Sequence, residues 1–205
     1  MKKLIVLFIS IFLILLSNVN AQNFQIGPEL KFGRIGLQNS YPHPSIIKLF
    51  DNSFADYNSI GIIGSYRPHS SIFSFKTGII YSHIGNNNPP DEYNKLVIIQ
   101  IPIGCDIKFG KKLFLFVGAG IDINYLLPQK KETLVFPDFQ LGLYAELGIG
   151  YELNKKWSFE LKHSMASDIT KLYKTEYQLQ NGLSNEKIYS TSADLGISIK
   201  YTFEK

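Results

Sequence analysis

Strict alternation between two kinds of side chain is the feature that most limits how this chain can fold. Residues 141–153, "LGLYAELGIGYEL", have an apolar residue at every odd position, while small, charged or tyrosine residues, including Gly142 and Glu146, lie between them. Successive side chains of a β-strand point to opposite faces, so the stretch predicts a strand whose two faces meet different surroundings. Either face can be the inner one. The apolar row is the core of a soluble barrel, but it contacts lipid in a membrane barrel.

The first 21 residues are typical of a secretory signal peptide. Lysines follow the first methionine, an apolar run with one serine in it extends from Leu4 to Leu16, and a small-residue cleavage site ends at Ala21. The run is shorter than the ~20 residues that a membrane helix needs, which argues against an uncleaved anchor. We therefore expect a cleaved signal over residues 1–21 and a single β-barrel domain over residues 22–205.

Charge and cysteine content exclude several classes of protein. The chain has 21 basic and 17 acidic residues, and two of its lysines lie in the signal, so the mature chain is nearly neutral. It has no basic block or stripe that would bind nucleic acid. Cys105 is the only cysteine, which excludes an intramolecular disulfide and an all-cysteine metal site. No later segment resembles a membrane helix, so any membrane crossing requires strands closed into a barrel.

Period-two alternation bounded by turn residues occurs in eight runs of the mature chain. No stretch between these runs has helical periodicity. The chain is therefore expected to be all-β, as an eight-stranded antiparallel up-and-down transmembrane β-barrel. The predicted strands are 25–37, 56–67, 72–84, 95–108, 112–126, 139–153, 157–163 or slightly beyond, and 190–203.

The connections between the runs alternate between long and short. An up-and-down barrel of the outer membrane has short periplasmic turns and longer outside loops, with both chain ends on the periplasmic side. The order of connections here fits that arrangement. The short ones are 67–71, 109–112 and 154–156, and the long ones are 38–55, 85–94, 127–138 and 168–189.

Residue parity assigns a face to each side chain. One row of each run is apolar, as with Leu141, Leu143 and Leu147, and the opposite row contains mid-strand charges such as Glu146. A lipid-facing charge near the bilayer midplane costs about 2–4 kcal/mol, so we predict that the apolar rows face lipid and the charged rows face the lumen. The predicted lumen-facing polar residues are Ser74, Lys76, Gln100, Asp106, Lys108, Asp122, Asn124, Glu146, Glu160, Lys162, Asp194 and Lys200.

Eight strands leave an interior only wide enough for side chains to fill. Charges in such a low-dielectric interior must be paired. We therefore predict a barrel plugged by a polar ladder rather than an open pore, with inward glycines such as Gly118 and Gly148 leaving room for a narrow file of water. The candidate pairs combine Lys76, Lys108, Lys162 and Lys200 with Asp106, Asp122, Glu146, Glu160 and Asp194.

Outward aromatic residues gather at both ends of the runs, and tyrosine and tryptophan concentrate where hydrocarbon meets water. The alternative is a soluble barrel such as a lipocalin-like carrier, but Trp157, the only tryptophan, is far from the first strand, where that family usually has one. The predicted belts are Tyr66, Phe73, Phe75, Phe109, Tyr151, Trp157, Tyr201 and Phe203 near the short turns, and Tyr81, Tyr93, Tyr125, Phe139 and Tyr189 near the long connections.

Residues 96–127 contain a proline-centred strand, a basic turn and a glycine-rich second strand. In these features the chain resembles the outer-membrane β-barrel domain family of Bacteroidetes-type bacteria, often called PorT-like. The resemblance implies an eight-stranded barrel in the outer membrane and brings no catalytic residues with it. The matching positions are Ile101, Pro102, Ile103, Gly110, Lys111, Lys112, Phe114, Gly118 and Gly120. Because Pro102 lacks the N–H that a ladder uses, and a closed barrel has no edge strand, we predict a bulge or a water-bound carbonyl there.

Few residues are candidates for catalysis or metal binding. His163 lies beside Ser164 and close to Ser167 near a predicted outer rim, and histidine can activate serine for acyl transfer. Adjacent strand residues point to opposite faces, however, so we interpret these as a rim histidine and loop-entry serines. The remaining candidates are read as surface histidines and a solvated loop tip, so we predict no catalytic, cofactor-binding or metal residue and no cofactor. These candidates are His43, His69, His83, Asp91 and Glu92. Of these, His83 could meet His163 at the outer rim.

The sequence therefore predicts a non-enzymatic, monomeric outer-membrane protein of a Gram-negative bacterium that contacts membrane lipid. Its long connections 38–55 and 168–189 would contact an extracellular or secretion-machinery partner, because binding is usually carried by loops on a rigid scaffold. The alternatives are small-solute transport or a role in a secretion apparatus, which the PorT-like resemblance implies. A lipid-acting enzyme is a third hypothesis.

Overall fold

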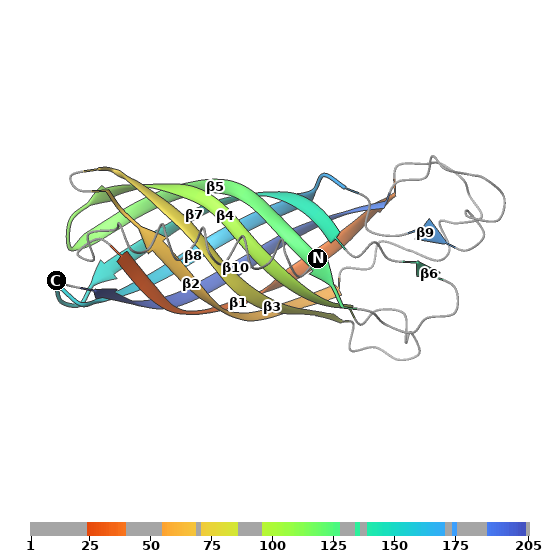
Figure 1. Ribbon diagram of the computed structural model, residues 1–205, viewed down its shortest axis with the longest axis horizontal. Coiled ribbons are helices and arrows are strands. Elements are labelled where there is room, and N and C mark those ends of the chain that lie inside the picture. The colour runs from red at the N-terminus through yellow and green to blue at the C-terminus, as the bar shows by residue number, and fades with distance from the viewer. Residues whose placement is uncertain are drawn as a thin grey trace, which may run out of the picture.

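The structure of this protein, a computed structural model, contains eight long strands closed into an antiparallel barrel (Figure 1). It describes residues 24–39, 55–68, 71–85, 96–127, 134–135, 139–170, 174–175 and 188–203. The barrel strands are β1 (Phe24–Asn39), β2 (Ala55–Tyr66), β3 (Phe73–Gly85), β4 (Leu96–Gly110), β5 (Leu113–Leu126), β7 (Phe139–Glu152), β8 (Trp157–Asp168) and β10 (Ile188–Phe203). Among the described residues, no helix is long and apolar enough to cross a membrane.

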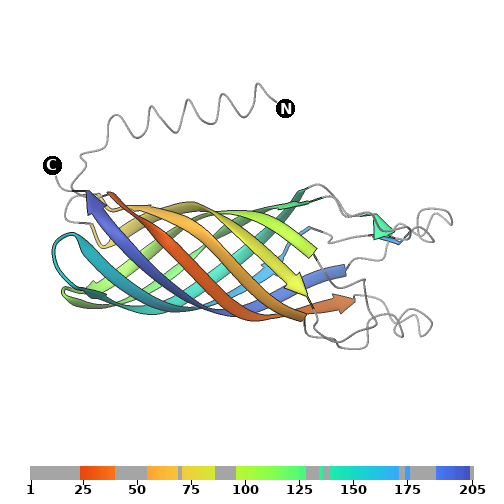
Figure 2. The same ribbon diagram turned by 90° about the horizontal axis from the view of Figure 1, so that it is seen from below.

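Each barrel strand pairs with the strands before and after it in the barrel order β1-β10-β8-β7-β5-β4-β3-β2. The first and last strands close the barrel by pairing from Phe24 opposite Phe203 to Asn39 opposite Ile188. Figure 2 shows them side by side along the length of the wall. The eight predicted strands and the up-and-down order are confirmed, with ends that shift by a few residues. The largest change is in β8, which continues to Asp168.

A second, two-stranded sheet pairs β6 (Leu134–Val135) with β9 (Lys174–Thr175). Both figures show it beyond one end of the barrel. We call this the loop end, and the opposite end, where the β2–β3, β4–β5 and β7–β8 turns lie, the turn end. Sequence reading assigned these residues to long connections, because two-residue strands are too short to show a period-two pattern.

The two faces of the wall have the predicted polarity. Leu141, Leu143 and Leu147 are 43%, 53% and 58% exposed, whereas Glu146 between them is 5% exposed. A soluble barrel would bury the leucines and expose the glutamate. Since the outer surface is apolar and the charges point inward, the barrel wall is built to meet lipid, which excludes the lipocalin-like alternative.

Aromatic side chains mark the turn end of this apolar surface. The ring centroid of Tyr201 lies 5.0 Å from that of Trp157 and 5.3 Å from that of Phe203, so Tyr201 of β10 contacts one ring on β8 and one on its own strand. Towards the loop end, Tyr125 and Phe139 pair at 5.1 Å. These positions agree with two interfacial belts. Of the predicted belt residues, Tyr93 and the side chain of Tyr189 lie outside the described residues.

Polar outward side chains define the loop-end limit of the apolar surface. Arg34 on β1 is paired in register with Asp56 on β2, and Asn58 of β2 is paired with His83 on β3. On the other side of β1, Gly36 is opposite Thr191 of β10. The change from apolar to polar side chains on the outer face is the expected signature of a membrane–water boundary.

Pro102 faces the lumen and interrupts one of its two ladders. Pairing between β3 and β4 includes Thr77 opposite Ile103 and resumes with Ile80 opposite Gln100, in an unchanged register. No residue is inserted, so the predicted bulge is wrong. The missing N–H removes the pairs beside the proline but leaves the strands aligned, while the β4–β5 ladder continues through Pro102 opposite Asp122.

Candidate functional site

The lumen is the main concentration of charged side chains in the barrel. Near its middle, Lys76 forms an ion pair with Glu146. Lys162 contacts Glu146 as well, with its Nζ atom 3.1 Å from Oε2, and lies 2.7 Å from Oε2 of Glu29. Further pairs extend this network. We call it the central cluster, and it consists of Glu29, Lys31, Lys76, Asp106, Glu146, Lys162 and Asp194.

A smaller cluster, which we call the turn-end cluster, lies closer to the turn end of the lumen and consists of Lys108, Glu160 and Lys200. Glu160 of β8 receives two lysines, with its oxygens 2.9 Å from Nζ of Lys108 and 2.6 Å from Nζ of Lys200. The Lys108 ammonium also lies 4.7 Å from the ring centroid of Phe114, a distance suited to a cation–π contact. The three charged side chains are buried, so each depends on the others for compensation.

The predicted polar ladder is confirmed in outline, but its membership differs. Glu29 and Lys31 were not among the predicted pairs, although the inward alternation of Gln25, Gly27, Glu29 and Lys31 in the first run was a usable signal. Asp122 was predicted to pair with a lysine, yet it forms no ion pair within the described residues. Pairing across the lumen depends on barrel stagger, which sequence parity does not supply.

These side chains close the lumen. Tyr144 is buried among them, with the Lys76 ammonium 5.0 Å from its ring centroid. The void left beside Glu29, Lys76 and Tyr144 measures about 10 Å³, and the next one towards the loop end about 20 Å³. Each void holds about one water molecule, so neither void admits a larger solute.

A neutral hydrogen-bonded group lies on the loop-end side of the plug. The Tyr57 hydroxyl donates to Gln100 Oε1 at 2.6 Å, and Ser82 donates to the same oxygen at 2.6 Å and contacts Ser59 at 3.0 Å. Asp122, which lines both small voids, lies on the neighbouring strand β5, opposite Pro102 of β4. Such a network fixes side-chain positions and contributes to a rigid interior.

Several buried lumen atoms have no hydrogen-bond partner among the described residues. They include the Tyr144 hydroxyl, Asn124 Oδ1 and the hydroxyls of Ser158, Ser164 and Ser198. Buried polar groups are usually satisfied by protein or by ordered water. This arrangement, together with the small voids, fits the predicted narrow file of water.

At the turn end the lumen widens into a cavity of about 150 Å³. Its walls include Gln25, Arg67, Glu152 and Ser158. Gln25 is itself held by Thr202, to whose hydroxyl its Nε2 atom donates at 3.0 Å. The cavity is therefore a mainly polar vestibule at the turn end of the lumen.

The candidate acyl-transfer residues are not brought together. His163 points outward and is exposed, whereas Ser164 points into the lumen and is 2% exposed, as parity predicts. The Nδ1 atom of His163 lies 2.9 Å from the backbone oxygen of Asp194, to which it donates in the Nδ1–H tautomer. Ser167 is outward like His163 but four residues further along the strand. Serine and histidine therefore form no nucleophile–base pair.

The predicted rim position of the histidines needs correction. Because β8 extends to Asp168, His163 lies within the strand rather than at its end. His83 lies on β3, and three strands separate β3 from β8 in either direction around the barrel. Both side chains face outward, so the two cannot meet. Within the described residues, no group of three histidine, cysteine or acidic side chains could hold a metal ion. His43, His69, Asp91 and Glu92 lie outside those residues.

The sequence matches no protein-family model and no curated protein. Solved structures resemble the fold. Neisserial surface protein A aligns with a TM-score of 0.55 at 15% identity, covering 88% of this chain and 97% of that one. The outer membrane protein OprG from Pseudomonas aeruginosa aligns with a TM-score of 0.53 at 12% identity, covering 91% of this chain and 98% of that one.

The outer membrane protein AlkL, solved in lipid bilayers, aligns with a TM-score of 0.51 at 8% identity and covers 92% of this chain and 93% of its own. All three alignments span nearly the whole neighbour. At such low identity the likeness concerns architecture and not activity. The chain therefore has the fold of the eight-stranded outer-membrane β-barrels.

Proposed function

We propose that this protein is a non-enzymatic outer-membrane barrel that acts as a plugged scaffold, with its long connections 38–55 and 168–189 making contacts at the cell surface. The observation that carries the proposal is the central cluster, whose ion pairs fill the lumen at the level of Glu146. A barrel that is closed inside and apolar outside leaves its ends as the surfaces on which specific binding can occur.

The location is supported by three features. The outer face of the wall is apolar, the aromatic rings gather at its ends, and the fold is shared with outer-membrane proteins. The amino-terminal 21 residues have the pattern of a signal peptide, which would deliver the chain across the inner membrane. In this orientation the turn end faces the periplasm and the loop end faces outside.

The experiment that tests the scaffold combines membrane fractionation, gel mobility and surface labelling. A folded barrel should appear in the outer-membrane fraction and change its mobility on boiling. A peptide epitope inserted between residues 176 and 186 should be accessible to antibody on intact cells, whereas the same epitope at Lys155 in the β7–β8 turn should become accessible only after the outer membrane is broken. Labelling of the Lys155 insertion on intact cells would overturn the orientation.

Small-solute transport is a second candidate, favoured by the unpartnered polar atoms of the lumen and by the turn-end cavity of about 150 Å³. Conductance across a planar bilayer separates the two functions. The plugged scaffold predicts no large stable steps, because the voids beside the central cluster are water-sized. Large steady steps from the purified full-length mature protein would overturn the plugged scaffold and support transport.

A role in a secretion apparatus follows only from the PorT-like resemblance of residues 96–127. A lipid-acting enzyme would depend on His163, which here faces outward and is bound to a backbone carbonyl. If purified protein hydrolysed lipid and His163→Ala abolished this activity while the heat-modifiable mobility was retained, the enzymatic hypothesis would replace the scaffold.

A further inference from the structure

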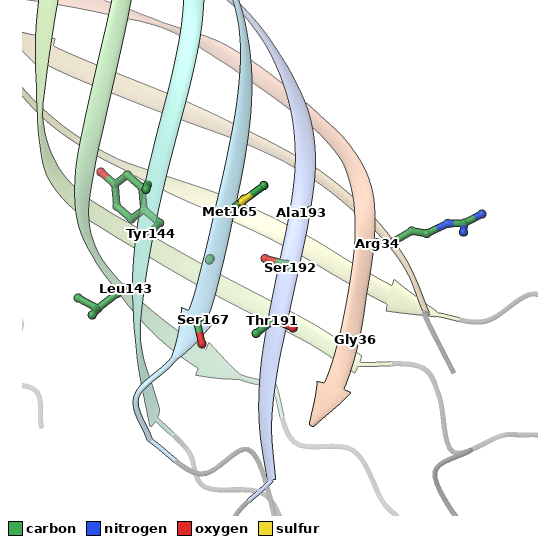
Figure 3. Close-up of a pocket in the computed structure, with 11 residues that line it drawn as sticks. Arg34, Gly36, Leu143, Tyr144, Met165, Ser167, Thr191, Ser192 and Ala193 are labelled. Atoms are coloured by element: carbon green, nitrogen blue, oxygen red, sulfur yellow. The ribbon is translucent and has the colours of Figure 1, made fainter. Parts of the chain in front are cut away.

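A groove of about 590 Å³ lies on the outer surface towards the loop end, across β7, β8, β10 and β1 (Figure 3). Its volume is within the range of small-molecule sites. Ala145, Met165, Ala193 and Arg34 are paired in sequence across these four strands and form one outward row of the groove. The groove is therefore part of the surface that meets the membrane.

Small side chains explain the depression. Ala145 and Ala193 lie on either side of Met165, and all three are exposed. Leu143, also exposed, adds a second large apolar side chain at the edge. A surface with alanine between larger side chains is hollowed along the alanines, and its lining is suited to a hydrocarbon chain.

The groove changes character towards the loop end. The next outward row consists of Leu143, Ser167, Thr191 and Gly36, which are again paired across the four strands. Two of these residues bear hydroxyl groups, whereas the row containing Ala145 and Ala193 bears none. The groove thus has an apolar part towards the middle of the wall and a hydroxyl-bearing part towards the membrane boundary.

Arg34 adds a positive charge at the β1 end of the row that contains Met165 and Ala193. Its side chain extends away from the wall (Figure 3) and is exposed. Asp56 is opposite it on β2, but within the described residues Arg34 forms no ion pair. An unpaired arginine on the outer face of a membrane barrel is tolerated only close to the interface. Its planar guanidinium is suited to binding phosphate through two hydrogen bonds.

We propose that this groove binds an acidic membrane lipid, with an acyl chain along Ala145, Met165 and Ala193 and the phosphate on Arg34. The charge complementarity and the order of the two parts select this occupant. Arg34 is at the β1 end of the row that contains Ala193 and Met165, next to Asp56 of β2, so an acid held by Arg34 leaves its acyl chain lying along the alanines. A protein partner would require no such order.

The test measures lipid binding to the purified full-length mature protein by mass spectrometry under native conditions in detergent. The probes are dioleoyl phosphatidic acid and dioleoylglycerol, which differ only in the phosphate. Arg34→Gln should weaken phosphatidic acid binding about tenfold and leave dioleoylglycerol unchanged, because one charge-assisted phosphate contact is lost. Lys112→Gln is the matched control, an exposed cation at the turn end, and should have no effect.

Filling the groove tests the chain-binding part. Ala193→Leu should weaken binding of both lipids, and Ala145→Leu serves as a second groove-filling variant if the first does not fold. Every variant is checked for heat-modifiable gel mobility, so loss of the barrel is separated from loss of the site. Equal losses in Arg34→Gln and Lys112→Gln, or unchanged binding in Arg34→Gln or in a folded groove-filling variant, would overturn the site. None of these outcomes depends on whether the long connections make surface contacts.

Discussion

Lys162 of β8 reaches across β10 to Glu29 of β1, with its Nζ atom 2.7 Å from Glu29 Oε2. Gly196 of β10 lies between the two strands, and a β-carbon added there would lie 3.0 Å from both Cγ and Cε of Lys162. Absence of a side chain at Gly196 therefore lets the lysine cross. Because β10 pairs with β1 to close the barrel, this ion pair joins the two sides of the closing seam.

Removing Lys162 should destabilise the barrel strongly. Lys162→Met leaves Glu29 and Glu146 without one of their cations in a buried site, so we expect the free energy of unfolding to fall by about 3–5 kcal/mol. Urea unfolding in lipid vesicles measures the change. Lys112→Met, which removes an exposed lysine from the β4–β5 turn, should change it by less than about 0.5 kcal/mol. Equal losses in both variants would contradict the buried network.

The same pair predicts non-additive effects. Glu29→Gln removes the acid that Lys162 contacts, so the combined variant Glu29→Gln with Lys162→Met should lose less stability than the sum of the two single losses. Residues in one ion-pair network couple by about 0.5–3 kcal/mol. Unfolding of the four proteins in the same vesicles measures the coupling, and strict additivity would show that the two residues do not interact.

Two lumen glycines should respond differently to alanine. A β-carbon at Gly120 would meet the backbone oxygen of Ile103 and lie 2.8 Å from Cε1 of Tyr144, whereas at Gly142 the nearest atom is 3.4 Å away. Gly120→Ala should therefore cost about 1–3 kcal/mol through overpacking. Gly142→Ala should stay within about 1 kcal/mol of the native protein. Thermal or urea unfolding compares the two, and the reverse order would contradict the packing described here.

Depth in the bilayer should decide the cost of an outward charge. Leu147, within β7, and Leu153, in the turn that follows, are both 58% exposed. Leu147→Arg should cost about 2–4 kcal/mol because it places a charge near the midplane, whereas Leu153→Arg should cost about 0–1 kcal/mol near the interface. Refolding equilibria in vesicles give both values. Similar costs at the two sites would show that the apolar wall is not centred on the membrane.

Trp157 reports the turn-end belt without any substitution, because it is the only tryptophan in the chain. Its ring contacts Tyr201 and it is 43% exposed on the outer face. Lipids brominated near the glycerol should quench its fluorescence more than lipids brominated near the chain ends, as expected for an interfacial ring. Stronger quenching by the lipids brominated near the chain ends would show that the ring lies in the hydrocarbon and not at the interface. The control is the urea-unfolded protein, whose fluorescence neither lipid should quench.

The sequence by itself determined the strands, the polarity of their faces and the belts. These properties are local: the period of a strand is set by its backbone, so Leu147 and Glu146 had to face opposite sides wherever the strand lay. The alternation of short and long connections added the order of the barrel.

Only the tertiary structure decided which side chains meet. Parity placed Lys162 in the lumen, but its contact with Glu29 across an intervening strand depends on the stagger of the closed barrel. The same stagger left Asp122 outside the ion pairs among the described residues and put Arg34 in line with Ala193 and Met165 to form the groove. Alternation along one strand carries no information about register between strands, and register determines these contacts.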